Sequence, residues 1–132
     1  MSAEAVVYAL LSGAGPVTSI VGTRVYPVVL PEGVKPPAVV YGLVSAMQPA
    51  TVDATSPTHL MRSRVQVDLV GADFALLRTL RDAVVAALRF QRGVIASFFV
   101  HAITLDLEAP VTFDQPLALW HRPLDFIVLH QQ

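Results

Sequence analysis

The sequence predicts an α+β domain with a largely antiparallel sheet of about four strands, one principal helix packed on one face and a short N-terminal helix. Three patterns in the chain lead to this prediction. Residues 58–70 alternate apolar and polar side chains, as in a strand with one face in water. Residues 72–89 place apolar side chains at steps of three and four, as in an amphipathic helix. Residues 38–48 and 94–107 are apolar at both parities, which is typical of strands covered on both faces.

The N-terminal third contains short elements separated by glycine and proline. Ser2 can cap a first helix that runs to about Leu11, and a Gly-Ala-Gly-Pro stretch then ends it. Residues 16–21 fit one more helical turn, because proline suits a first helical position. We expect a short strand over 23–27 and an extended, proline-rich loop over 27–37.

The remaining segments connect and complete the sheet. Residues 49–57 are rich in Thr, Ala, Ser and Pro and form a loop, and Asp73 is placed to complement the dipole of the principal helix. Residues 109–116 contain two prolines and form a second loop. A last strand is expected over 117–130, in which Pro123 indicates a bulge or an edge position.

Composition indicates one folded domain over residues 1–132. The 132 residues are 54% hydrophobic and only 14% charged, where about 25% charged is usual, so part of the surface is expected to be covered by a partner. The net charge of −1 argues against tight binding to a polyanion. The absence of cysteine excludes disulfides, thiolate metal sites and cysteine nucleophiles.

An uncharged stretch between Glu4 and Arg24 has the length of a membrane span but not its composition. Serine, glycine, proline and threonine interrupt its apolar content. We therefore expect a short soluble helix followed by a turn, and no membrane partner.

The sequence shows no constellation typical of catalysis or cofactor binding. The histidines have no metal-binding spacing; they are His59, His101, His121 and His130. Ser97, His101 and Asp125 can be combined into a triad on paper, but no Gly-x-Ser-x-Gly elbow accompanies them. No glycine-rich phosphate loop is present. The prediction is a protein that is not an enzyme and that holds no cofactor or metal.

One polar strand face is the most distinctive feature of the predicted sheet. Its members alternate along residues 58–70; they are Arg62, Arg64, Gln66 and Asp68. Two arginines beside an aspartate are typical of a solvated or ion-paired face, because phosphate binding needs several uncompensated cations. Asp106 and Glu108 share a strand parity, and we expect them on one face as a solvated rim.

The order of several short motifs resembles the tail-completion or tail-terminator proteins of long-tailed bacteriophages and gene transfer agents. The resemblance spans nearly the whole chain, and Val70-Gly71 departs from an aromatic residue common in relatives. The motifs are Val21-Gly22-Thr23-Arg24-Val25-Tyr26-Pro27, Pro37-Ala38-Val39-Val40-Tyr41, Arg64-Val65-Gln66-Val67-Asp68-Leu69, a helix with Leu80, Val84 and Leu88, and His121-Arg122-Pro123-Leu124-Asp125-Phe126-Ile127-Val128.

This resemblance implies a structural virion protein. It implies a ring, expected to be a homohexamer, on the head-proximal end of the tail tube, assembled in the host cytoplasm. Such a ring stops tube polymerisation and joins the tail tube protein to the head connector or stopper. DNA is expected to pass through the lumen without specific binding, which fits the near-zero net charge.

Two surface hypotheses and two alternative functions follow. The polar face of residues 58–70 is expected either to line the lumen or to form ion pairs between subunits, and the loop 49–57 is a second candidate contact. One alternative is another head-tail junction or tail-tube protein. The other is a small ligand-binding or hydrolase domain with an apolar pocket near His101 and Trp120.

Overall fold

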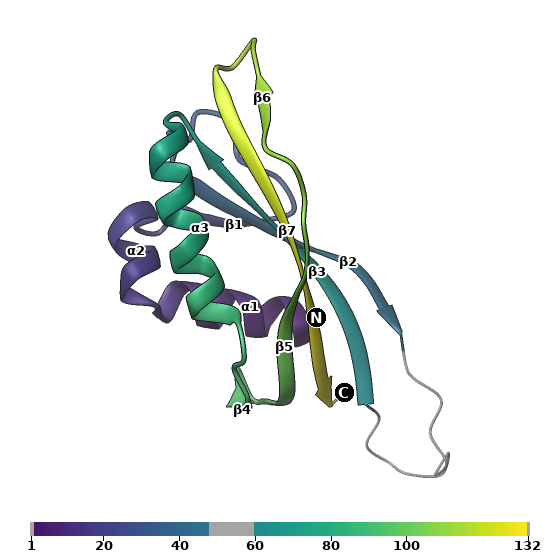
Figure 1. Cartoon of the computed structure of the whole chain (residues 1–132). Helices are drawn as coiled ribbons and strands as arrows, with labels where there is room; N and C mark the ends of the chain where they lie inside the picture. The colour runs from purple at the N-terminus through teal and green to yellow at the C-terminus, as the bar shows by residue number, and fades with distance from the viewer. Residues whose placement is uncertain (1, 48–59, 132) are drawn as a thin grey trace.

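The computed structural model describes residues 2–47 and 60–131 (Figure 1). This part of the chain forms three helices and a seven-stranded sheet. The elements are α1 (Ser2–Gly13), α2 (Gly15–Val21), β1 (Val25–Pro27), β2 (Ala38–Met47), β3 (Leu60–Gly71), α3 (Phe74–Leu88), β4 (Gly93–Ile95), β5 (Phe98–Glu108), β6 (Thr112–Asp114) and β7 (Leu119–Gln131). The α+β class is confirmed.

The sheet has more strands than predicted. Its order is β1-β2-β3-β7-β5-β4, and β6 also pairs with β7. The four long strands lie where the sequence places them, but three strands of three residues each extend the sheet. The sheet is also mixed, because β1 pairs with β2 in parallel while the other pairings are antiparallel. β1 lies within the short strand expected over 23–27, whereas β4 and β6 were not expected as separate strands, because three residues are too few to show a clear alternation.

The predicted single strand over 94–107 is a hairpin. Ala96 and Ser97 turn the chain with φ angles of 52° and 69°, so that β4 folds back on the start of β5. Two successive left-handed residues are the geometry of a type I′ turn, which normally carries Asn-Gly or Asp-Gly. The Ala-Ser pair lacks these turn-forming residues, so the turn could not be predicted from the sequence.

The prediction for Pro123 is wrong. The residue lies within β7, which is flanked by β3 on one side and by β5 and β6 on the other, and its pairing with Asp68 continues the β3 register without a shift. The sheet tolerates the missing N–H because β5 ends beside Leu124 and β6 begins beside His121, so Pro123 falls between the two neighbouring strands. Its carbonyl accepts a hydrogen bond from the Ala109 N–H at 3.0 Å.

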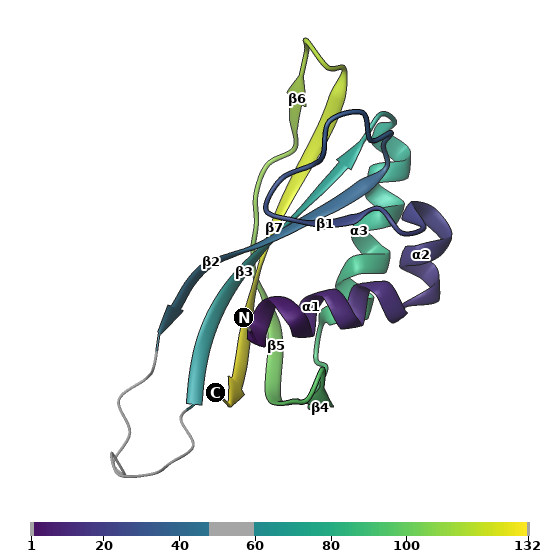
Figure 2. The ribbon, with the colours of Figure 1, turned by 180° about the vertical axis from the view of Figure 1, so that it is seen from behind.

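All three helices cover the same face of the sheet (Figures 1 and 2). The principal helix begins where Asp73 caps it, because the carboxylate accepts a hydrogen bond from the Ala75 N–H at 3.0 Å. The core joins apolar side chains of all three helices to the inner side of the sheet. Its members include Val6, Val7, Leu11, Val17, Val21, Leu77, Leu80, Val84, Leu88, Val65, Val67, Leu69, Leu124 and Phe126. The short N-terminal helices thus extend the cover that the principal helix provides.

No single helix among the described residues is long and apolar enough to cross a membrane. Of the described helices, only α1 and α2 taken together reach that length and composition, and they are bent by 81° at their junction. Both helices place valines in the core.

Candidate functional site

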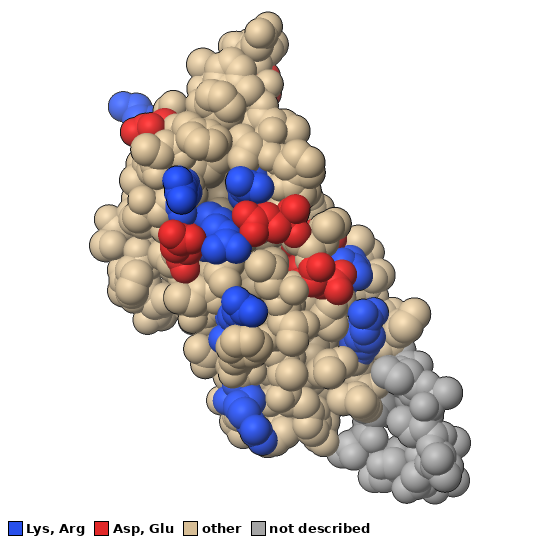
Figure 3. All heavy atoms as spheres, in the orientation of Figure 1, with Lys and Arg blue, Asp and Glu red and all other residues tan. Residues whose placement is uncertain are grey.

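On the face seen in Figure 3, acidic and basic side chains gather across the middle, and further Lys or Arg side chains lie below them. Within the described residues they form two ion-pair networks, one on each face of the sheet beside β5. A chain with so few charges therefore concentrates many of them near one sheet edge.

The first network lies on the face of the sheet without helices. The Arg64 guanidinium pairs with Asp106 of β5 at 2.6 Å and with Asp125 of β7 at 3.2 Å. Hydrogen bonding to Asp106 is the largest of the effects that raise the pKa of Arg64 above its ordinary value. The single guanidinium thereby joins three neighbouring strands.

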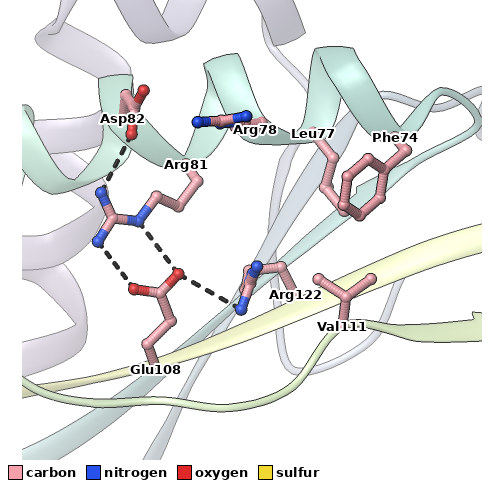
Figure 4. Close-up of a pocket in the computed structure, with 8 residues that line it drawn as sticks. All are labelled: Phe74, Leu77, Arg78, Arg81, Asp82, Glu108, Val111 and Arg122. Atoms are coloured by element: carbon pink, nitrogen blue, oxygen red, sulfur yellow. Dashed lines mark hydrogen bonds and ion pairs between the residues drawn. The ribbon is translucent and has the colours of Figure 1, made fainter.

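The second network lies on the helix-covered face (Figure 4). Arg81 of α3 donates two hydrogen bonds to the Glu108 carboxylate, at 2.8 and 3.2 Å, and the same carboxylate lies 3.4 Å from Arg122 of β7. Arg81 also pairs with Asp82 at 3.0 Å. A bidentate arginine–carboxylate pair fixes orientation as well as distance, so this network sets α3 against the end of β5.

A bulge in β5 separates the two networks. The register with β7 shifts between Leu105 and Leu107, which leaves Asp106 as the extra residue. Asp106 consequently bonds to Arg64 on one face, whereas Glu108 bonds to Arg81 on the other. The prediction that Asp106 and Glu108 share one face is wrong, because it assumed uninterrupted alternation.

The second network forms one side of a cleft of about 410 Å³ between α3 and the β5–β7 region (Figure 4). We call this the α3–β5 cleft. Its lining residues are Phe74, Leu77, Arg78, Arg81, Asp82, Glu108, Val111 and Arg122. Three guanidinium groups face two carboxylates, which leaves one positive charge uncompensated. Arg78 is exposed and makes no ion pair with any residue that the structure describes.

Sequence reasoning missed this cleft. Arg81, Glu108 and Arg122 come from three separate elements, and no local spacing connects them. The amphipathic pattern of the principal helix places its arginines outside the apolar stripe, but it does not indicate what they face.

The four predicted polar residues lie along β3 as expected, alternating with buried side chains. Arg62 and Gln66 are exposed, whereas Arg64 and Asp68 are half-buried and have partners within the chain. Asp68 accepts a hydrogen bond from His121 at 3.0 Å, and its other carboxylate oxygen is buried with no partner among the described residues. Burial raises the pKa of the Asp68 carboxyl, and the bond to His121 opposes that rise.

The histidines do not form a metal centre within the part of the chain that the structure describes. His130 is buried and lies 2.8 Å from the Ser63 hydroxyl, and His101 packs its ring edge-on against Phe99. His59 lies outside the described residues.

The geometry does not favour the triad of Ser97, His101 and Asp125 or the pocket near His101 and Trp120 that the alternative function required. Ser97 lies in the β4–β5 turn, and Asp125 is held by Arg64. The α3–β5 cleft is lined neither by His101 nor by Trp120, whose ring contacts Phe74 and Phe113.

Comparison with known proteins identifies the family. The family model described as tail completion protein gp17 matches residues 5–131, which is almost the whole chain. The chain belongs to the tail completion protein gp17 family. The resemblance suggested by its motifs is therefore confirmed, and the chain is a structural protein of a phage tail.

A solved structure shares the fold of this chain. It is a chain of the virion of a native gene transfer agent particle, with 19% sequence identity and a TM-score of 0.76. The match covers 98% of this chain and 94% of that one. No curated protein matches the chain.

Proposed function

We propose that this protein forms a ring, a homohexamer, on the head-proximal end of the tail tube. The ring stops tube polymerisation and joins the tube protein to the head connector or stopper. It is assembled in the host cytoplasm, and DNA passes through its lumen without specific binding. Family membership and the virion context of the structural neighbour support this proposal.

Two free strand edges carry the argument for a ring. On one side of the sheet, β1 covers only residues 39–41 of β2, and no described strand pairs with the outer side of 43–47. On the other side, β4 covers only residues 98–100 of β5, and no described strand pairs with the outer side of 104–108. Unpaired strand edges are templates for pairing with another chain.

The two free edges differ, so pairing one with the other gives a head-to-tail contact. Such heterologous contacts close into a ring when the rotation between copies allows it. Exposed apolar side chains accompany both edges, with Val44 and Met47 on β2 and Leu107 on β5. Burying them between copies would account for the low charge content of the chain.

The polar face of β3 fits either the lumen or a contact between copies. Arg64 is already neutralised by two carboxylates within the chain, whereas Arg62 is exposed and makes no ion pair with the described residues. Replacing Arg64 with glutamate would place a third carboxylate beside Asp106 and Asp125 and disturb the fold. Arg62→Glu is therefore the cleaner test. Loss of rings in R62E would favour a contact between copies at this face. Intact rings with altered DNA passage would favour a face that lines the lumen. Wild-type behaviour of R62E would contradict both hypotheses.

The candidate contact loop 49–57 lies outside the described residues and stays a prediction.

Electron microscopy of tails assembled with and without the protein tests the proposed function. Capped tails of uniform length with the protein, and overgrown uncapped tubes without it, are the expected results. Indistinguishable tails would overturn termination. Long filaments of the protein alone would instead favour a tube subunit, because head-to-tail contacts that do not close continue without limit.

A matched pair of variants tests the free-edge contact. Leu107→Lys places a charge on the β5 edge, and we expect loss of the ring in sedimentation velocity. Leu117→Lys makes the same change at an exposed position in the turn between β6 and β7, and the ring should persist. Rings of wild-type mass with L107K would contradict the edge contact.

A further inference from the structure

The loop that follows β1 exposes apolar side chains and an acidic one. Val28 and Val29 are 71% and 66% exposed, and Glu32 is exposed with no ion pair to any described residue. The Val28 N–H donates a hydrogen bond to the Tyr41 carbonyl at 2.8 Å, which holds the loop at the outer side of β2. We call residues 28–34 the β1–β2 loop.

The α3–β5 cleft has the complementary chemistry. One part of its lining is apolar, with Phe74 47% exposed beside Leu77 and Val111. The rest carries one uncompensated positive charge, and among the described residues Arg78 is the arginine without an ion-pair partner there. Figure 4 shows the Arg78 side chain on α3, apart from the network of Arg81, Glu108 and Arg122. An occupant that offers apolar side chains and one carboxylate would satisfy both parts.

The loop and the cleft lie at opposite edges of the same sheet. The β1–β2 loop adjoins the edge at which the strand order starts, whereas the cleft adjoins β5, near the edge at which it ends. A head-to-tail repeat brings these two edges together. We propose that the β1–β2 loop of one copy docks in the α3–β5 cleft of the next, with the Glu32 carboxylate against Arg78; this inference rests on the ring of the proposed function.

Charge favours a second copy as the occupant. Among the described acidic side chains, those without an ion pair are Glu4, Glu32, Asp73 and Asp114. Asp73 caps α3, and Glu4 and Asp114 are half-buried. Glu32 is therefore the exposed carboxylate that is free to meet Arg78, and its neighbours Val28 and Val29 supply the apolar side chains.

Charge exchange tests the contact on the full chain. Arg78→Glu and Glu32→Arg each place like charges together and should weaken assembly about tenfold or more, measured by sedimentation velocity over a concentration series. The double variant R78E/E32R restores opposite charges and should recover most of the wild-type assembly. Both residues are exposed, so the monomer should keep its melting temperature. Single variants that assemble like wild type, or a double variant weaker than both singles, would overturn the contact.

Cysteine pairing gives a readout that does not depend on assembly strength. The chain has no cysteine, so E32C/R78C introduces the two thiols needed for a disulfide between copies. Under oxidation, free or bound to tail tubes, it should give a ladder of linked chains, whereas each single variant stops at a dimer. Absence of a ladder in both settings would overturn the contact. If reduced E32C/R78C still produces tails of normal length, the proposed function stands independently of that result.

Discussion

Asp106 and Glu108 are two residues apart on β5 and yet bind arginines on opposite faces of the sheet. Asp106 meets Arg64 on the open face, and Glu108 meets Arg81 beneath the principal helix. The bulge after Leu105 causes this, because one extra residue reverses the direction of the side chains that follow. A single irregularity thus gives one strand an electrostatic contact to both layers.

Glu108→Gln should lower the free energy of unfolding by about 1 kcal/mol, because Arg81 and Arg122 then share a neutral partner. Urea denaturation measures the change. Asp82→Asn removes a more exposed partner of the same Arg81 and should cost about 0.3 kcal/mol. An equal loss of unfolding free energy in both variants would contradict a larger contribution of Glu108, which pairs with two arginines, than of Asp82.

Asp68→Asn should raise stability at neutral pH by about 1 kcal/mol, since burial disfavours the charged carboxylate and the amide oxygen can still accept from His121. The sign follows from the raised pKa: folding favours the protonated form. The cost of the ionised group is therefore present above the folded-state pKa and disappears as the pH falls toward the ordinary value of 3.8.

Thermal unfolding of D68N and wild type between pH 7 and pH 3 measures this difference, which should shrink as the solution becomes acidic. The neighbouring exchange Gln66→Asn changes no titratable group and should give a difference that does not vary with pH. A gain for D68N that grows on acidification would show that the sign is wrong.

The β4–β5 turn holds Ala96 and Ser97 in the left-handed region. Replacing the pair with Asn-Gly should stabilise the fold by about 1 kcal/mol, because these residues adopt a type I′ turn with little strain. The control A96V/S97V puts β-branched side chains in the same geometry and should destabilise it. Melting temperatures of the two double variants should move in opposite directions, and a shared direction would exclude the turn as the cause.

Val28 is a β-branched residue with a φ angle of 68°, a conformation that costs stability. Val28→Gly should raise the free energy of unfolding of the monomer by about 1 kcal/mol. Val29→Gly removes a similarly exposed side chain without relieving a positive φ. This variant should lower the free energy of unfolding by about 0.5 kcal/mol. Both glycines remove apolar surface from the proposed contact, so assembly should weaken in both despite their opposite effects on stability.

The long elements were predictable because their patterns repeat many times. The principal helix shows its apolar stripe over four turns, and β3 alternates along most of its length. The position of Asp73 at the start of this helix also followed from the sequence, whereas its cap hydrogen bond to the Ala75 N–H is a finding of the structure. The strands β4 and β6 contain three residues each, and the Ala-Ser turn carries no glycine or asparagine, so local signals for them were absent.

Amino-acid order by itself determined the α+β class, the polar face of β3 and the family, because periodicity and motif order are properties of the linear chain. Only the folded molecule decided that β7 is flanked on both sides, that the β5 bulge parts Asp106 from Glu108, and that Arg78, Arg81 and Arg122 line one cleft. These features depend on strand register and on contacts between residues distant in sequence, which free energy selects over the whole domain rather than within any segment.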